Sequence, residues 1–324
     1  MIRFVLLLLV VCFPLTGGEY ADAFLKASIH PQSQALGHST VARGLTAGHA
    51  LNNPAGFRSD SLAISTLYQT FAGLSENLTL EAVFPLSEDY RIGLTVVHSM
   101  VSDLTERPDL YGLSPQERRD SVRVIPSGNP IAYRENAAIL SLAREYRFDI
   151  NLGWKFFKIP CRMPIGLSVK YFDKLLEENR GLGVGFDMGT QIFFNLEGMS
   201  RLLKHTEFGL GYMFTDILNS PVYWTTKHQD AIKRQFHRGA SITQNVGTTG
   251  TRVSYSTAYV SGAEGGRRSG LELSFRDLFD ARLGHDGEVT SFGLGIGLKK
   301  FIIDYSFSRN ELANLQRIGI KYHF

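Results

Sequence analysis

The sequence predicts an all-β fold: a transmembrane antiparallel β-barrel of the outer-membrane type, with about 14 strands and an N-terminal plug-like segment. Three features lead to this prediction: a two-residue hydrophobic period from about Ser61 onward, an export signal at the N-terminus, and an aromatic last residue, Phe324. The chain has 324 residues, of which 44% are hydrophobic, a formal charge of +3 and a mean hydropathy of −0.06. These values exclude a disordered chain.

The N-terminus has the layout of a secretory signal peptide over residues 1–23. A short positive start at Arg3 precedes the apolar run Phe4–Leu15, and small residues follow up to Ala21-Asp22-Ala23. A helix needs roughly 18 to 20 apolar residues to cross a bilayer, so this run is too short to be a transmembrane helix. We therefore expect export and cleavage after Ala23.

Cysteine usage and charge exclude several classes of protein. After cleavage only Cys161 would be left, so neither a disulfide scaffold nor a cysteine-ligated metal site is expected. The nine histidines show no metal-ligand spacing, and we expect no metal and no cofactor. A charge of +3 spread over this length gives no broad basic surface, so nucleic acid is not an expected partner.

The strands predicted from about Ser61 onward have one apolar face and one face of small, polar or charged residues. In residues 292–298, Phe292 and Leu294 alternate with Gly293 and Gly295. A charge facing lipid costs about 2 to 4 kcal/mol at the midplane, so the charged face should line a wet lumen. The charges predicted to be luminal are Lys170, Asp187, Glu207, Glu272, Arg276, Asp304 and Arg317.

Two alternatives remain open at this point. A soluble sandwich would also keep charges on the outside of its sheets. The luminal charges could pair across strands, which we favour, or line a substrate path.

Arg144 and Arg238 fall in the apolar phase of their segments, which means that they lie near a membrane interface or that the assigned register is wrong there.

The connections fit a barrel with both termini on the periplasmic side, where turns are short. The third connection, Ser102–Glu135, is the longest and would be an outer loop. Phe148–Pro164 fits poorly, because it should be a short turn yet is long and aromatic. Helical spacing is scarce, and the best candidates are Asp230–Phe236 and Glu197–Lys204.

Residues 24–58 do not alternate and are predicted to plug the lumen of the barrel formed by residues 59–324. Phe24, Leu25 and Ile29 could contact a hydrophobic ligand or simply pack the start of the plug. The segment ends in a turn motif, Asn53, Pro54, Ala55 and Gly56. Proline sets φ, glycine permits a tight path, and the asparagine side chain can satisfy backbone groups.

The last strand carries the most specific signal. Phe324 ends the chain, Tyr322 lies two places before it and Gly319 five places before it. This pattern resembles the C-terminal signal that the barrel-assembly machinery of bacteria reads as an edge strand.

The motifs together resemble the PorV/PorQ family, which belongs to the wider class of FadL-like outer-membrane barrels. The resemblance rests on Asn53–Gly56 before the first strand, on Ala35-Leu36-Gly37, on the glycine alternation of Gly181–Asp187, on Asp304–Phe307 and on the aromatic C-terminus. The chain departs from the family pattern between these motifs, with His38-Ser39-Thr40 followed by Arg43–His49. The resemblance is to the broad family and does not select a subfamily.

The resemblance implies a protein of the bacterial outer membrane that is an accessory component of type IX protein secretion. Its implied partners are outer-membrane lipid, the barrel-assembly machinery, a larger secretion translocon and exported cargo proteins. The alternative is a FadL-like channel for hydrophobic small molecules such as long-chain fatty acids. We do not expect an enzyme, since the most suggestive cluster, His285–Glu288, contains the hairpin-turn signal Asp-Gly.

The turn motif gives a first prediction. The double variant Asn53→Ala with Gly56→Val should assemble or plug poorly, because it removes both the polar side chain and the small residue of the turn. Loss of heat-modifiable migration on a gel is the expected result. Unchanged migration and detergent resistance would contradict the prediction.

Overall fold

The computed structural model describes most of the chain from residue 22 onward. The described ranges are 22–27, 29–45, 47–57, 61–71, 75–102, 104–105, 110–123, 131–151, 153, 158–197, 205–247, 250–262, 265–309 and 314–324. The predicted signal peptide falls almost entirely outside these residues. Its cleavage therefore stays a prediction.

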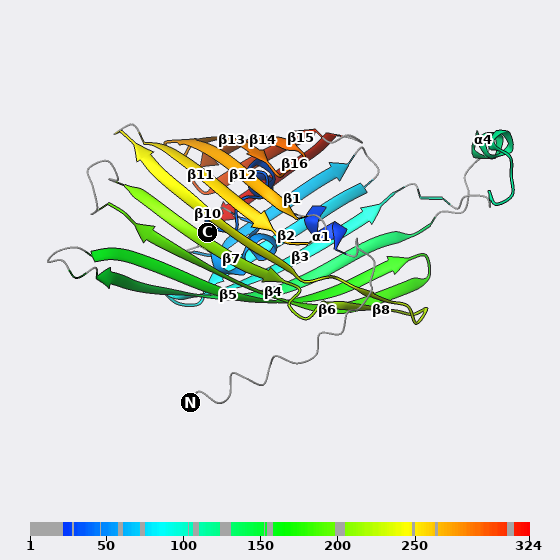
Figure 1. The fold of residues 1–324 in the computed structure, drawn as a ribbon, viewed down its shortest axis with the longest axis horizontal. Helices are drawn as coiled ribbons and strands as arrows, with labels where there is room; N and C mark the ends of the chain where they lie inside the picture. Colours follow the sequence, from blue (N-terminus) through cyan, green and yellow to red (C-terminus); the bar gives the residue numbers. More distant parts are fainter. Residues whose placement is uncertain are drawn as a thin grey trace, which may run out of the picture.

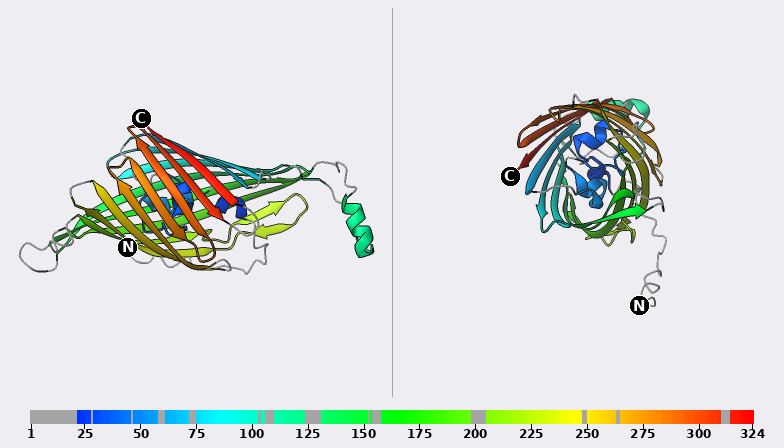
Figure 2. Two further views of the ribbon diagram at one scale, coloured as in Figure 1. Left: turned by 90° about the horizontal axis from the view of Figure 1, so that it is seen from above. Right: turned by 90° about the vertical axis from the view of Figure 1, so that its left-hand side faces the viewer.

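The described strands form a closed antiparallel barrel (Figures 1 and 2). Of the sixteen strands, β8 and β9 make a side hairpin on β6, and the other fourteen form the wall, closed by pairing of β1 with β16. The barrel fold and its strand number are thus confirmed. The strands are β1 Ala63–Phe71, β2 Ser75–Pro85, β3 Tyr90–Val101, β4 Tyr133–Asn151, β5 Lys158–Leu176, β6 Asn179–Asn195, β7 Thr206–Thr215, β8 Pro221–Trp224, β9 Gln229–Ala231, β10 Gln235–Val246, β11 Thr251–Val260, β12 Gly266–Phe275, β13 Phe279–His285, β14 Thr290–Leu298, β15 Phe301–Arg309 and β16 Asn314–His323.

The apolar residues of the wall face outward. On β14, Phe292 and Leu294 are 54% and 61% exposed, whereas the alternating residues Ser291 and Gly293 are buried. A soluble sandwich would bury its apolar face, and a mainly apolar outer surface of this extent is not found on soluble monomers. The distribution is that of a transmembrane barrel with a lipid-facing exterior and a polar interior.

The wall is taller on one side, because β4 and β5 have 19 residues each and β6 has 17, whereas β14 and β15 have nine. This height corrects the interpretation of Phe148–Pro164 as a long turn. Most of that segment is strand, with β4 running to Asn151 and β5 starting at Lys158.

The register at the two exceptional arginines is the one assigned from the sequence, and both side chains lie on the outer face. Arg144 pairs with Tyr90, the first residue of β3, and its guanidinium carbon is 4.9 Å from the centre of the Tyr90 ring. Arg238 is near the start of β10, 5.2 Å from the ring of Tyr259. Arg144 is thus level with the end of the neighbouring strand β3, although β4 itself continues to Asn151. Tyrosine and arginine at such positions are typical of membrane interfaces.

The helices are short, and most lie inside the barrel (Figure 2). The plug contains α1 Ala23–Ala27, α2 Pro31–Ala35, α3 His49–Asn52 and the 3₁₀ turn η1 Pro54–Gly56. A fourth helix, α4 Pro115–Arg123, stands away from the wall in the third connection (Figure 1). Among the described residues, no helix combines the length and the apolar character needed to cross a membrane.

The predicted helix over Asp230–Phe236 is wrong. Residues 229–231 form β9, and β10 begins at Gln235, since this stretch pairs with neighbouring strands instead of forming local hydrogen bonds. The other candidate, Glu197–Lys204, lies almost wholly outside the described residues.

The outward alternation predicts a depth-dependent cost of charge. Leu294→Arg, at the centre of β14, should lower the free energy of unfolding in lipid vesicles by about 2 to 4 kcal/mol, and Leu298→Arg, at its end, by about 0 to 1 kcal/mol. Denaturant titrations of the refolded variants measure both values. Equal losses at the two positions would contradict a lipid-facing outer surface.

Candidate functional site

The N-terminal segment crosses the lumen and packs against the inner wall, and this plug with its contacts is the candidate functional site. The side chains of Leu36, Val41, Ala50 and Phe57 are buried. Glycines on the luminal face of the wall allow the plug backbone to approach closely. A Cβ on Gly284 would overlap the backbone of Leu36 and Gly37, and one on Gly211 would overlap Val41 and Ala42.

The turn motif ties the end of the plug to the wall. Asn53 Oδ1 accepts a hydrogen bond from the Ala55 backbone N–H at 3.0 Å, and Asn53 Nδ2 donates to the Val41 carbonyl at 2.9 Å. The asparagine thus caps η1 and joins two parts of the plug. Its side chain also lies where a Cβ on the wall residue Gly189 would stand.

The sequence predicts that the backbone needs a glycine at Gly56, but the close contacts of the turn are made at two glycines of the wall. A Cβ on Gly56 would be 3.7 Å from the nearest atom, the Gln191 amide nitrogen, which is an ordinary contact. A Cβ on Gly166 or Gly189 would overlap Pro54 or Asn53. The interpretation of Gly56 is therefore corrected, because the close approach is between the plug and strands β5 and β6.

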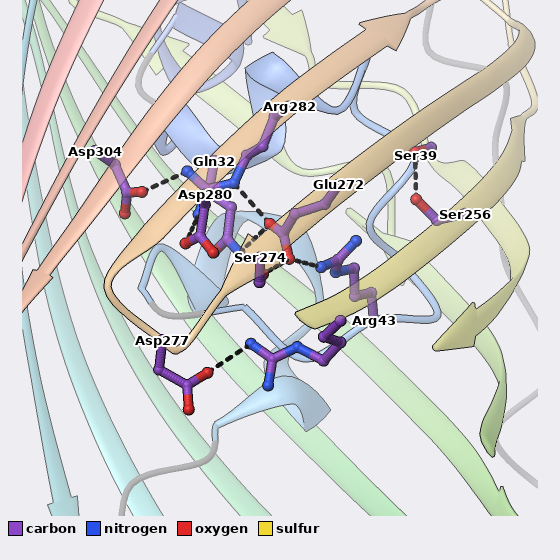
Figure 3. Close-up of polar contacts among 11 residues, drawn as sticks. Gln32, Ser39, Arg43, Ser256, Glu272, Ser274, Asp277, Asp280, Arg282 and Asp304 are labelled. Atoms are coloured by element: carbon purple, nitrogen blue, oxygen red, sulfur yellow. Dashed lines mark hydrogen bonds and ion pairs between the residues drawn. The ribbon is translucent and has the colours of Figure 1, made fainter. Parts of the chain in front are cut away.

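An ionic cluster joins the plug to strands β12, β13 and β15 (Figure 3). Arg282, fully buried, contacts Glu272 and Asp280 at 2.6 Å and Asp304 at 2.5 Å. From the plug, Arg43 forms an ion pair with the other oxygen of Glu272. Gln32 Nε2 donates to Glu272 at 3.4 Å. Buried charges are tolerated when they are paired and hydrogen-bonded. Each charged side chain of this cluster has an ion-pair partner, and among the buried polar atoms of these described residues only Nη1 of Arg43 lacks a hydrogen-bond partner.

Neutral hydrogen bonds hold the plug on the other sides. Gln191 Nε2 on β6 donates to the carbonyls of Val41 at 2.9 Å and Arg43 at 3.1 Å. Gln34 accepts a bond from Ser306 at 2.7 Å and donates one to Ser308 at 2.6 Å. Other plug contacts come from Ser241 on β10, Ser256 on β11 and Glu81 on β2. The plug is held around the circumference of the wall.

Most of the charges assigned to the lumen from the sequence point inward. Lys170 is buried and lies 2.8 Å from both Asp187 and Asp216. Arg317 donates to the carbonyls of Ile29 at 3.1 Å and Lys26 at 3.4 Å in the plug. Glu207 pairs with Arg162 at 2.5 Å and is half-buried. Glu272 and Asp304 belong to the ionic cluster.

Arg276 is the exception and corrects the assignment from alternation. β12 ends at Phe275, and Arg276 begins the turn with a φ of 52°. Its side chain is exposed, with the guanidinium carbon 5.1 Å from the centre of the Phe275 ring. Alternation no longer applies once the strand has ended.

Sequence reasoning missed the central residues Arg43 and Arg282. Arg282 lies in β13, one of the strands with the weakest alternation, although its place between Ala281 and Leu283 could have indicated a luminal position. Arg43 was notable only as a departure from the family pattern. Its contact with Glu272 joins residues 229 positions apart, which no local pattern reveals.

Two cavities lie on opposite sides of the plug. One of about 390 Å³ lies toward the end of the barrel that carries Asp216 and Asp286, and one of about 270 Å³ lies toward the end that carries Arg252 and Asp280. Leu25 and Ile29 line the larger cavity. Phe24 packs edge-on against Phe172, with 6.3 Å between ring centres, in a buried apolar cluster.

The C-terminal residues lie at the end of the wall where β1 begins. Tyr322 packs against Phe301 and Phe324, with ring centres 4.7 and 4.8 Å apart. Gly319 faces the plug, where a Cβ would stand 2.8 Å from His30 Nε2. This strand therefore closes the barrel and contacts the plug at the same time.

No family model matches the chain, and no curated protein matches it. Solved structures similar to it include the toluene transporter TodX of Pseudomonas putida, with 11% identity, 89% of this chain and 95% of that chain covered, and a TM-score of 0.42. A FadL homologue of Pseudomonas aeruginosa is 8% identical to this chain, with a TM-score of 0.43. The match covers 91% of this chain and 98% of the homologue. A TodX deletion mutant described as a monoaromatic hydrocarbon channel is 10% identical to this chain, with a TM-score of 0.45. The match covers 91% of this chain and 98% of the mutant.

The plug contains a histidine held in its neutral form. His30 precedes α2, and its Nδ1 accepts a hydrogen bond from the Gln32 backbone N–H at 3.3 Å. Burial lowers the pKa of His30 from 6.5 to about 4, although the carboxylates of Asp304 and Glu81 act in the opposite direction. Protonation would place a hydrogen on Nδ1 and remove the cap of α2.

The plug should therefore loosen in acid. A lowered pKa means that the contribution of His30 to stability is complete above pH 6.5 and is lost as the pH falls toward 4. His30→Asn keeps a capping side chain without the titration, so its melting temperature should fall less between pH 7 and 4.5 than that of the wild type, by at least ~3 °C. Parallel curves for the two proteins would show that His30 does not titrate with unfolding.

Proposed function

We propose that this protein is a bacterial outer-membrane barrel, exported through a cleaved signal peptide, that is closed by its own N-terminal segment and acts as an accessory component of type IX secretion. In this role it docks to a larger translocon or receives exported cargo, as the resemblance to the PorV/PorQ family implies. The outer surface and wall of the barrel serve the partner, while the lumen stays closed.

The observation that carries this proposal is the way in which the plug is fixed. Moving the plug out would separate Arg43 from Glu272, and breaking a buried ion pair by removing one partner typically costs about 3 to 5 kcal/mol. It would also break the bonds from Gln191 and Asn53 to the plug carbonyl of Val41. A solute gate that opens often needs a weaker attachment, so a permanently closed barrel is the better use of these contacts.

A FadL-like channel for hydrophobic small molecules is the second candidate, favoured by the larger cavity. Leu25, Ile29 and Met213 line it, and it adjoins the apolar cluster around Phe24. The same cavity is also lined by Lys170, Asp187 and Asp216, which form ion pairs. This mixed lining suits an apolar solute less well than a mainly apolar pocket would.

We also propose a non-enzymatic role. The cluster His285–Glu288 covers the end of β13 and the turn to β14, where Asp286 Oδ1 accepts hydrogen bonds from the backbone N–H groups of Glu288 and Val289. These side-chain contacts serve the turn. Among the described residues, no group of three or more histidine, cysteine or acidic side chains is placed to hold a metal ion.

Conductance measurements test the closed lumen. In planar bilayers the wild type should show almost no ion current, and Arg43→Gln should show frequent openings, because Glu272 loses its only charged partner among the described residues of the plug. Arg276→Gln is the matched control, since that arginine is exposed in a turn and should leave the barrel closed. A large steady current through the wild type would contradict the proposal.

Co-purification tests the secretion role separately. Tagged full-length protein, extracted from its native membrane in mild detergent, should carry a second and larger barrel with it. A monomer without a partner, combined with loss of fatty-acid uptake when the gene is deleted, would favour the channel instead.

A further inference from the structure

The turn between β14 and β15 carries two lysines beside a group of aromatic rings on the outer surface. Lys299 and Lys300 form the turn, and both are exposed. Together with Leu298, Phe301 and Tyr322 they line a surface hollow of about 560 Å³. We call this group of five residues the lysine-aromatic hollow.

The hollow combines fixed positive charge with an apolar floor. Neither lysine has an acidic side chain as a partner within the part of the chain that the structure describes. Lys300 Nζ lies 5.9 Å from the centre of the Tyr322 ring, which positions the ammonium group by a weak cation–π contact. Tyr322 packs between Phe301 and Phe324, so the rings form a continuous surface.

The strand lengths place this hollow at the edge of the hydrocarbon layer. β14 and β15 have nine residues each, which is the shortest length that crosses a bilayer as a tilted strand, about 9 to 11 residues. Their outward residues, including Leu294 and Leu298 on β14, are exposed and apolar up to the turn. The lysines therefore follow directly after the last lipid-facing side chains.

Arg276, in the β12–β13 turn, differs from the two lysines because an acidic residue, Asp277, directly follows it in the same turn. Asp277 pairs with Arg252 at 3.1 Å and adds a negative charge to that turn. The β14–β15 turn has no acidic residue in its sequence, which reads Leu298-Lys299-Lys300-Phe301. The positive charge at this point is uncompensated by the turn itself.

We infer that the lysine-aromatic hollow is a binding site for the headgroup of an anionic phospholipid. The lysines contact the phosphate and the negative headgroup, and the first part of the acyl chains lies on Leu298, Phe301 and Tyr322. A polar headgroup joined to apolar chains matches a site in which positive charge and an apolar surface meet at the membrane boundary. Since short turns mark the periplasmic side of bacterial barrels, the lipid would come from the phospholipid leaflet that faces the periplasm.

The test uses the full-length protein in detergent micelles, examined by native mass spectrometry with added phosphatidylglycerol or phosphatidylcholine. The wild type should retain one more lipid molecule per protein when phosphatidylglycerol is added than when phosphatidylcholine is added. The variant Lys299→Gln with Lys300→Gln should retain phosphatidylglycerol about thirtyfold less, since each of the two basic residues near a membrane surface contributes about 1 kcal/mol. Heat-modifiable migration of the variant shows that the barrel has folded.

Lys227→Gln is the matched control, because Lys227 also lies in a turn with positive φ and is exposed, but at the opposite end of the barrel. It should bind phosphatidylglycerol as the wild type does. Equal retention by the double lysine variant and the wild type would overturn the inference. Equal retention of both lipids, or complete displacement of the lipid by millimolar inorganic phosphate, would overturn it too, by reducing the hollow to an apolar surface or to a simple anion site.

Discussion

The contact between the plug backbone and the luminal glycines of the wall is the constraint on which this structure depends. A barrel of fourteen strands encloses more space than the side chains of its wall can fill, unlike an eight-stranded barrel. The space is filled by a second layer of chain, and the backbone of that layer comes closest to the wall where the wall has no Cβ. Gly166 and Gly189 beside the Asn53-Pro54 turn show this most directly.

The same constraint explains the charges inside the barrel. Where the plug approaches the wall this closely, a charge between them is removed from water and must be compensated within the protein. Arg282 is surrounded by Glu272, Asp280 and Asp304, and Arg43 supplies a second positive charge from the plug. His30 satisfies the same requirement by staying neutral, at the expense of stability in acid. Packing and electrostatics therefore fix the plug together.

The sequence predicted the wall of this barrel well, because alternation is a local property that each strand expresses within ten residues. It placed Lys170, Asp304 and Arg317 inside correctly by the phase of their strands, and it failed at Arg276, where the strand had already ended. It could not predict the pairing of Arg43 with Glu272 or the fit of Pro54 against Gly166, since these depend on how the plug folds back across the lumen. The full length of strands β4 and β5 also escaped detection, because the ends that extend into Phe148–Pro164 lose the alternation of the membrane-spanning part.

Hydrogen–deuterium exchange of the purified barrel, followed residue by residue, tests most directly whether the plug is an integral part of the fold. The amides of Leu36 and Asn53, which bond within the plug to Gln32 and His49, should exchange as slowly as those in the centre of β14. They should exchange faster in Arg43→Gln, while β14 stays protected. Exchange of the plug amides within seconds in the wild type would show a loosely held segment and would contradict this account.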